Sequence, residues 1–291
     1  MKAKIIILTP VYNDWKNLTK LLAKINIIFK NNLKKKFDLV VVNDSSTEKL
    51  EIKKLKFKSI NRLRLISLVQ NVGSQRALAI GIRCINKIYK KNYKVIIIDS
   101  DGQDNPAAIT KLINYSKKKK KNAIVVNRGQ RKESLWFKMF YESYCLLINI
   151  FTGKKIRFGN YSLLSSDHIK KIKNCDDLWS AYPPTISNNI KNIHYITMDR
   201  EKRFSGKSKM NFFGLVFHAF RVFSVLRFKI LISSSFYLFL NYIFFFKNNL
   251  NILFYFILII LILFNSTNFL ISIFNKNKFQ IAFNKALDNN F

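Results

Sequence analysis

The chain has 291 residues, of which 51 are Lys or Arg and only 16 are Asp or Glu, so its formal net charge is +35. Hydrophobic residues still make up 49% of the sequence, which excludes a disordered basic tail, and eight Gly with four Pro exclude a collagen-like chain. The three cysteines, Cys84, Cys145 and Cys175, form no paired framework. This fits a reducing compartment and argues against a disulfide-built secreted fold.

The excess of basic residues has a compositional explanation that lowers its value as a functional signal. Lys, Asn, Ile and Phe are all abundant, and all four have codons rich in A and T. The sequence contains no RNP-like aromatic motif, no zinc finger and no clear helix-turn-helix, so we predict no nucleic-acid partner. A body this basic is still attracted to phosphorylated ligands and to anionic membrane lipids, which we predict as partners.

Residues 1–205 alternate short apolar runs with amphipathic stretches, which is typical of an α/β domain. The apolar runs are rich in β-branched residues and bounded by polar or turn residues, so each is predicted to be a buried strand. These runs are residues 5–8, 39–42, 65–68, 95–98 and 123–126, with a further strand-like run at 194–197. The predicted helices are residues 14–29, 73–89, 106–118 and 134–152. The sheet is therefore expected to be mostly parallel.

Three polar clusters follow predicted strands at the point where each strand ends. They are residues 9–14 (Thr-Pro-Val-Tyr-Asn-Asp), 43–46 (Asn-Asp-Ser-Ser) and 99–104 (Asp-Ser-Asp-Gly-Gln-Asp). In an open α/β sheet, ligands bind beyond the carboxyl ends of the strands, so these loops are expected to build one crevice. Asp99 and Asp101 are one residue apart, and alternate side chains of an extended segment point the same way. Because Mg²⁺ binds one or two carboxylates together with phosphate oxygens, this pair predicts a metal–diphosphate site.

The C-terminal part of the chain changes to long apolar segments. Residues 211–227 carry an apolar face with His218 and Arg221 between, which predicts a helix in the membrane interface; a core helix of the domain is the alternative. Residues 230–246 and 250–274 contain no charged residue, and both segments are long enough to span about 30 Å of hydrocarbon. We therefore predict a transmembrane hairpin rather than a pair of buried core helices.

Basic residues before and after the hairpin give its orientation. Arg221, Arg227 and Lys229 precede it, and Lys276, Lys278 and Lys285 follow it. The positive-inside rule then predicts a multi-pass protein of the inner (cytoplasmic) membrane with the large domain in the cytoplasm. The predicted divisions are 1–210 for the α/β domain, 211–229 for the interfacial helix, 230–275 for the hairpin and 276–291 for a cytoplasmic tail. The sequence leaves the oligomeric state open, and a homo-oligomer is one of the states it allows.

Five segments carry a resemblance to a known family. They are residues 9–13, 42–47, 71–77, 99–106 and 203–209. In their order and spacing they resemble the motifs of family 2 glycosyltransferases of the GT-A fold, and most closely those of the dolichol- or polyprenyl-phosphate sugar synthase branch. The resemblance covers residues 4–210. It implies a Rossmann-like nucleotide-sugar-binding domain, and transfer with inversion from a nucleotide-diphospho-sugar donor to a polyprenyl-phosphate acceptor, with Mg²⁺ or Mn²⁺ as cofactor.

The resemblance also implies roles for particular residues. The residues expected to border the nucleotide are Pro10, Tyr12, Asp44, Asn71, Gly73 and Gln75. Asp99 would approach the sugar or ribose, and Asp101, with Gln103, would hold the divalent cation. Arg128 and Arg131 would meet phosphate or sugar. The segment 203–209 looks like the branch's acceptor loop, in which Arg203, Ser208 and Lys209 would bind the lipid phosphate or the donor diphosphate. Asp99, Asp101, Arg203 and Lys209 form the expected catalytic set.

One segment departs from the branch. Residues 159–165 stand where the lipid-phosphate synthases commonly have Gly-Asp-Phe-Arg-Leu, and here Asn160 and Ser162 replace the acid and the Arg. This indicates a sub-branch with a different substrate. Two alternatives stay open. The first is transfer to a hydroxyl of a cell-surface glycan or lipid, for which the Asp176–Asp177 pair would supply a base. The second is a membrane-bound nucleotide-sugar-binding scaffold without catalysis.

Overall fold

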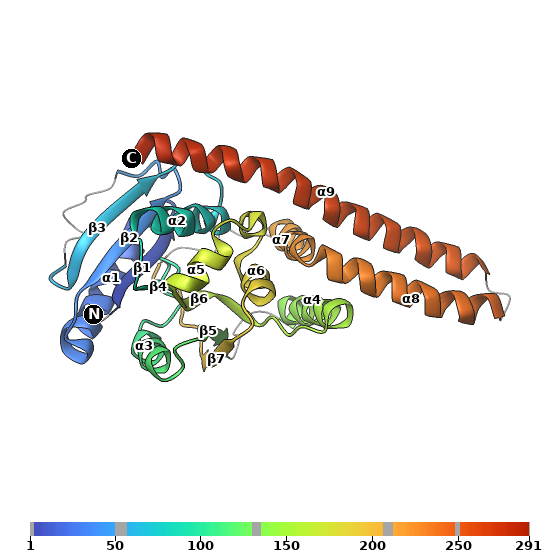
Figure 1. The fold of residues 1–291 in the computed structure, drawn as a ribbon, viewed down its shortest axis with the longest axis horizontal. Coiled ribbons are helices and arrows are strands. Elements are labelled where there is room, and N and C mark those ends of the chain that lie inside the picture. Colours follow the sequence, from blue (N-terminus) through green and yellow to red (C-terminus); the bar gives the residue numbers. More distant parts are fainter. Residues whose placement is uncertain (1–2, 50–56, 130–134, 206–211, 248–250, 291) are drawn as a thin grey trace.

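The computed structural model describes residues 3–49, 57–129, 135–205, 212–247 and 251–290. Its centre is a seven-stranded sheet in the order β3-β2-β1-β4-β6-β5-β7 (Figure 1). The strands are β1 (Lys4–Val11), β2 (Phe37–Asn43), β3 (Ile60–Ser67), β4 (Tyr93–Ile97), β5 (Ala123–Arg128), β6 (Phe158–Ser165) and β7 (Ile193–Met198). All pairs are parallel except those that β6 makes with β4 and β5. The mostly parallel sheet predicted from the apolar runs is confirmed.

Both faces of the sheet are covered, because alternate residues of each central strand point to opposite sides. In β1, Ile6 and Leu8 pack into one core cluster, and Ile5 and Ile7 pack into the other. Helices α1 (Trp15–Ile27) and α3 (Ala108–Lys118) cover the second face, and α1 continues into the π-helical segment η1 (Ile28–Leu33). The elements on the first face include α2 (Ser74–Ile88), α5 (Ser166–Ile172), η3 (Asp176–Trp179) and α6 (Tyr182–Asn189).

Strand β6 is an element that the sequence pattern did not predict. It inserts antiparallel between β4 and β5, with Ile97 opposite Ser162 and Ile124 opposite Leu163. Its segment carries glycine, asparagine and serine among its apolar residues, so it lacks the apolar run by which the other strands were recognised. The antiparallel strand brings its own polar residues, Asn160 above all, to the crevice edge of the sheet.

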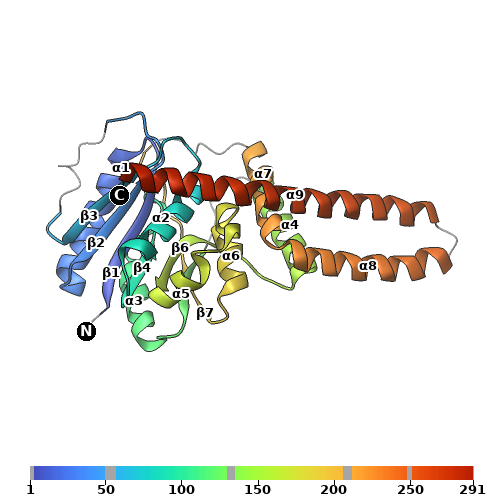
Figure 2. The same cartoon turned by 45° about the horizontal axis from the view of Figure 1, so that its top comes forward.

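Three helices form the C-terminal part: α7 (Phe212–Val225), α8 (Arg227–Lys247) and α9 (Asn251–Asn290). Helices α8 and α9 run antiparallel and project away from the sheet (Figures 1 and 2). Both are long and apolar enough to cross a membrane, and only 11% and 6% of their apolar windows are buried. Phe236 and Phe256 are typical, with 58% and 62% of their surface exposed. An apolar surface of this size indicates a membrane protein.

Residues 276–290, predicted to be a separate tail, continue α9 back onto the domain, as Figure 2 shows. Apolar residues at helical spacing, Phe279, Ala282, Phe283 and Ala286, face the first core cluster. Phe279 stacks on Trp179 at 5.1 Å between ring centroids, and the Arg83 guanidinium lies 3.7 Å from the Phe279 centroid. The sequence predicted a cytoplasmic tail here without assigning it a structure, and the apolar stripe is what attaches it to the domain.

Helix α7 has one side buried in the core and an exposed side that also carries apolar residues. Ala219, Val222 and Phe223 are buried in the core, where Phe223 contacts Phe264 of α9 at 5.3 Å between centroids. Phe213 and Phe217 on the other side are 80% and 53% exposed. Nearby, α4 (Leu135–Thr152) lies against α8, and the Ser233 hydroxyl donates to the Phe151 carbonyl at 2.7 Å. Helix α7 thus connects the domain to the two apolar helices α8 and α9.

Candidate active site

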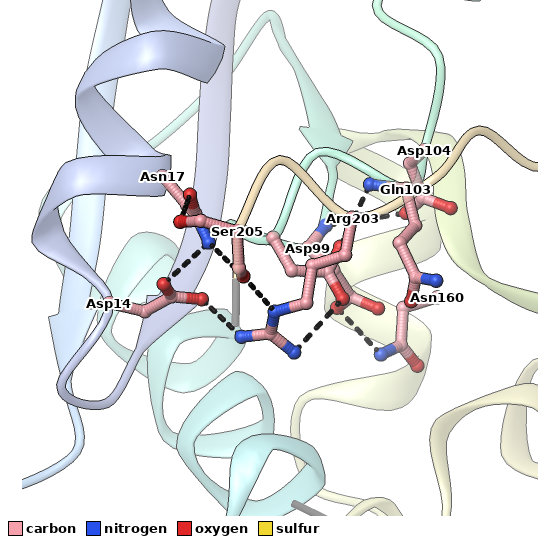
Figure 3. Close-up of polar contacts among 9 residues, drawn as sticks. Asp14, Asn17, Asp99, Gln103, Asp104, Asn160, Arg203 and Ser205 are labelled. Atoms are coloured by element: carbon pink, nitrogen blue, oxygen red, sulfur yellow. Dashed lines mark hydrogen bonds and ion pairs between the residues drawn. The ribbon is translucent and has the colours of Figure 1, made fainter. Parts of the chain in front are cut away.

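Three carboxylates crowd the loop between β4 and α3. The backbone N–H of Asp99 donates to Asp104 at 3.3 Å, and the N–H of Gln103 donates to Asp101 at 3.0 Å. Burial is the largest cause that raises the pKa of Asp101 and of Asp104, and the charge of Asp99 is the second. The pKa of Asp104 rises to about 7. Figure 3 shows Asp99 and Asp104 within this group. The loop therefore holds more negative charge than it neutralises by itself, which suits a cation.

The described residues contain no group of three or more His, Cys, Asp or Glu side chains arranged to hold a metal ion. Mg²⁺ and Mn²⁺ are commonly bound by one or two carboxylates together with substrate phosphate oxygens. Asp101 and Gln103, the predicted ligands, are adjacent in this loop, and both are partly exposed.

The ends of β1 and β2 lie at the same edge of the sheet as this loop, because β1 pairs in parallel with both β2 and β4. Pro10 is buried in β1 opposite Val42, and Tyr12 is half-buried just beyond the strand. Asn13 has a φ of 46°, and its side-chain oxygen accepts from the Thr47 N–H at 2.8 Å. This bond ties the loop after β1 to the loop after β2.

Asp44, expected in the nucleotide pocket, has only 2% of its surface exposed. Its carboxylate accepts from the N–H groups of Val72 and Gly73, at 2.8 and 2.9 Å. Burial raises its pKa to about 6, although these two bonds and Arg76 lower it. Asp44 thus shapes the loop before α2, where Gly73 adopts a φ of 88° and Asn71 is exposed.

Arg203 points inward and bridges acidic residues from two loops (Figure 3). Its guanidinium forms an ion pair with Asp14 and lies 3.8 Å from Asp101. Its Nε donates to the Ser205 carbonyl at 3.0 Å, and the Ser205 hydroxyl donates to Asn17 at 2.6 Å. The prediction put Arg203 on a phosphate. In the structure it lies on Asp14 and Asp101, and its contact with a phosphate stays a prediction.

Four arginines from different elements form a basic group around the crevice. They are Arg76 in α2, Arg128 at the end of β5, Arg200 after β7 and Arg221 in α7. The Nε atom of each is buried and has no hydrogen-bond partner among the described residues. Burial, and next the charge of Arg221, lowers the pKa of Arg76 to about 10. Carboxylates of Asp44 and of the 99–104 loop face three of these arginines, and the unbonded N–H donors remain available to an anionic ligand.

The other residues predicted for the site lie in three different situations. Arg128 lies beside Asp104 and Arg200 in a small pocket, with its guanidinium packed on Gly159. Gln75 has both amide atoms bonded to other protein groups. Arg131, Ser208 and Lys209 lie outside the described residues.

Sequence reasoning assigned no role to several residues that line or support this site. They are Asp14, Asn17, Asp104, Asn160, Arg76, Arg200 and Arg221. Asp14 and Asp104 are the last residues of two of the three polar clusters that the sequence pointed out, so their neighbours gave a usable signal. No local motif marks Arg200 or Arg221.

Comparison with protein families and curated proteins gives consistent results. A family model described as Glycosyl transferase family 2 matches residues 6–173. An uncharacterized glycosyltransferase of Synechocystis sp. is 27% identical over 229 residues, which are 74% of this chain and 67% of that protein. An undecaprenyl-phosphate 4-deoxy-4-formamido-L-arabinose transferase of Photorhabdus laumondii is 24% identical over 221 residues, which are 73% of this chain and 65% of that protein. The chain spans about two thirds of the length of these relatives.

Solved structures share the fold. Glucosyl-3-phosphoglycerate synthase from Mycobacterium tuberculosis, in complex with uridine diphosphate (UDP), has a TM-score of 0.51 and 13% identity. The alignment covers 78% of this chain and 80% of that chain. Another mycobacterial protein has a TM-score of 0.53 at 11% identity, covering 78% and 75% of the two chains. These likenesses concern the fold alone, and with the family match they confirm the expected GT-A fold.

Proposed function

Because the chain belongs to glycosyl transferase family 2, we propose that it is a membrane-anchored inverting glycosyltransferase. It moves a sugar from a nucleotide-diphospho-sugar to a polyprenyl phosphate at the cytoplasmic face of the inner membrane. One observation carries this proposal. The crowded carboxylates of the 99–104 loop lie close to arginines whose buried Nε atoms have no hydrogen-bond partner among the described residues, in a chain with two exposed apolar helices.

The carboxylate loop suits the donor diphosphate and a divalent cation. Asp101, with Gln103, would hold Mg²⁺ or Mn²⁺ together with diphosphate oxygens, since its carboxylate is partly exposed and crowded by Asp99. When bound, the cation supplies charge neutralisation for the leaving diphosphate. Arg203, already 3.8 Å from Asp101, stabilises the same developing charge from the protein side. Asp99 orients the sugar or ribose.

The basic group suits the acceptor. A lipid phosphate carries a charge of roughly −1.5 to −2 near pH 7, as other phosphate monoesters do. Arg221 lies in α7, which packs against the membrane helix α9, so a headgroup leaving the bilayer reaches this arginine early. Arg76, whose pKa the charge of Arg221 helps to lower, lies further in. An anionic acceptor needs positioning rather than deprotonation, so the reaction requires no general base.

The contacts of Asp176 and Asp177 weaken the hydroxyl-acceptor alternative. Asp176 lies 3.4 Å from Arg83, and Asp177 lies 2.8 Å from Arg227. Arg83 also stacks on Phe279 of α9, which makes this pair part of the helix attachment. Carboxylates that are engaged in attaching a helix are less available to a substrate hydroxyl.

The test uses purified full-length protein in detergent with Mn²⁺, a panel of nucleotide sugars, and either undecaprenyl phosphate or undecaprenol. Mass spectrometry of the lipids should show a sugar added to undecaprenyl phosphate only. Arg221→Ala and Arg76→Ala should raise the KM for the lipid at least about tenfold, because charge-assisted bonds to phosphate are strong. Arg62→Ala, at an exposed position of β3, is the matched control.

Other outcomes of the same assay favour the alternatives. Sugar added to undecaprenol would support a hydroxyl acceptor. Binding of UDP with Mn²⁺ but no transfer from any donor to either lipid would support the scaffold hypothesis.

A further inference from the structure

A chain of side-chain amides runs from the start of α6 to Asp99. The N–H of Tyr182 donates to the side-chain oxygen of Gln75 at 3.0 Å. The Gln75 amide nitrogen donates to the side-chain oxygen of Asn160 at 2.8 Å. The Asn160 amide nitrogen donates to Asp99 at 3.0 Å, as Figure 3 shows. These residues come from α6, α2, β6 and the loop after β4, so the chain joins four parts of the fold.

The direction of this chain is fixed at its first member. Tyr182 is the first residue of α6, so its N–H has no acceptor inside the helix and can only donate. The oxygen of Gln75 must therefore face Tyr182, which leaves its NH₂ group for Asn160. The oxygen of Asn160 must then face Gln75, which leaves its NH₂ group for Asp99. Each amide orientation follows from the one before it.

The chain is protected from water at its middle. Asn160 is 5% exposed, and its backbone carbonyl accepts from the Ser162 hydroxyl. The same hydroxyl is hydrogen-bonded to the Tyr182 hydroxyl at 2.6 Å. A buried amide with fixed partners on both sides has one orientation, because reversing it would place two donors or two acceptors face to face. Asp99 therefore meets a donor of fixed position.

We propose that Gln75 and Asn160 are positioning residues that hold the Asp99 carboxylate in its working orientation. This inference deepens the proposed function and rests on it for the role of Asp99. It gives Gln75 a different task from the predicted nucleotide contact, since both of its amide atoms are used inside the protein.

The start of the chain is attached to membrane helix α9. Asn275 donates to the Ser180 hydroxyl at 2.8 Å, two residues before Tyr182. Its side-chain oxygen accepts from Arg76 at 3.2 Å, and Arg76 follows Gln75 directly in the sequence. Asn275 is itself 6% exposed. Helix α9 thus fixes both elements between which the first bond of the chain forms.

A substrate-free experiment tests the chain and its direction. The sequence contains five glutamines, so ¹⁵N-glutamine labelling gives few side-chain signals, and Gln75→Glu identifies the signal of Gln75 by its loss. We expect its NH₂ group to exchange with water more slowly than that of exposed Gln280. Asn160→Ala should abolish this protection, whereas Asn160→Asp should keep it, because an aspartate oxygen still accepts from Gln75.

Fast exchange of Gln75 in the parental protein, or protection that survives Asn160→Ala, would overturn the proposed chain. Protection that is lost in Asn160→Asp as in Asn160→Ala would overturn its direction. None of these outcomes depends on a sugar donor, so they stand even if the proposed function fails.

The transfer assay tests the consequence for catalysis. Gln75→Glu removes the donor to Asn160, and Asn160→Asp places a carboxylate against Asp99. Each should lower kcat at least about tenfold, with the KM for the lipid changed much less, as expected for a positioning role. Gln280→Glu, the same type of change at an exposed position of α9, should retain parental kcat. A kcat that falls only in proportion to the folded fraction, or does not fall, would overturn the positioning role.

Discussion

The 200–205 loop packs closely against the carboxylate loop, and Phe204 makes its tightest approach. The ring of Phe204 covers Gly102, and a Cβ added at Gly102 would lie 2.2 Å from Cε2 and 2.3 Å from Cδ2 of that ring. The Phe204 N–H also donates to the Asp101 carbonyl at 3.3 Å, and the Lys24 amine lies 4.6 Å from the ring centroid. Gly102→Ala should therefore displace Phe204 and loosen the loop that carries Arg203.

The size of the effect follows from two costs. Gly102 has a φ of 80°, and a left-handed conformation costs a residue with a Cβ about 1–2 kcal/mol. Displacing the half-buried Phe204 ring loses roughly a further 1–2 kcal/mol of apolar burial. We expect the free energy of unfolding to fall by about 2–4 kcal/mol. Gly153→Ala is the matched control, because Gly153 has a φ of 65° but no atom within 4 Å of its added Cβ.

The assay is denaturant unfolding of the purified protein in detergent, repeated in a Phe204→Ala background. Because the Phe204 ring is absent in that background, Gly102→Ala should lower the free energy of unfolding there by about 1–2 kcal/mol less. Gly153→Ala should cost the same in both backgrounds. The reasoning is refuted if Gly102→Ala costs no more than Gly153→Ala, or if its cost is unchanged by Phe204→Ala.

Three further predictions follow from single residues. Asp101→Ala should abolish the Mn²⁺ dependence of UDP binding in titration calorimetry, and unchanged dependence would exclude Asp101 as a ligand. Burial, and next the charge of Arg221, lowers the pKa of His218 to about 4. The unfolded chain therefore binds more protons between pH 6.5 and 4, so acidification over this range should cost about 3 kcal/mol of stability, and His218→Gln should remove that contribution in unfolding curves. Asn275→Leu leaves its buried partners Arg76 and Ser180 without their bonds and should lower unfolding free energy by about 1–3 kcal/mol, while the protein stays in the membrane pellet at high pH.

Much of the fold was predictable because its strongest signals are local. A parallel strand buried on both faces must be a continuous apolar run, and the five such runs all became strands. The polar clusters after β1, β2 and β4 lie at one edge of the sheet, because neighbouring parallel strands end at the same side. The shared sheet edge at which Asp99 and Asp101 stand could thus be predicted without any coordinates.

The unpredicted features depend on contacts between distant segments. Strand β6 is stabilised by its antiparallel neighbours rather than by an apolar run, so Asn160 gave no sign of facing Asp99. Arg203 and Asp14 are 189 residues apart, and only the folded loop brings them together. Gln75 looked like a donor contact because it stands in the motif, but its amide is bonded to Tyr182 and Asn160. Composition and spacing contain no information about such pairings.

The length of α9 bears on how the crevice meets the lipid. At 1.5 Å per residue, about 20 residues cross the roughly 30 Å hydrocarbon layer, so about half of this 40-residue helix is left outside it. That half is the part with Asn275 and Phe279, which attach to Arg76, Ser180 and Trp179. An attachment along a continuous helix keeps the distance between crevice and bilayer constant, because the helix cannot shorten. On the proposed function, a fixed distance is what positions a lipid phosphate at Arg221 and Arg76 without drawing the lipid tail out of the membrane.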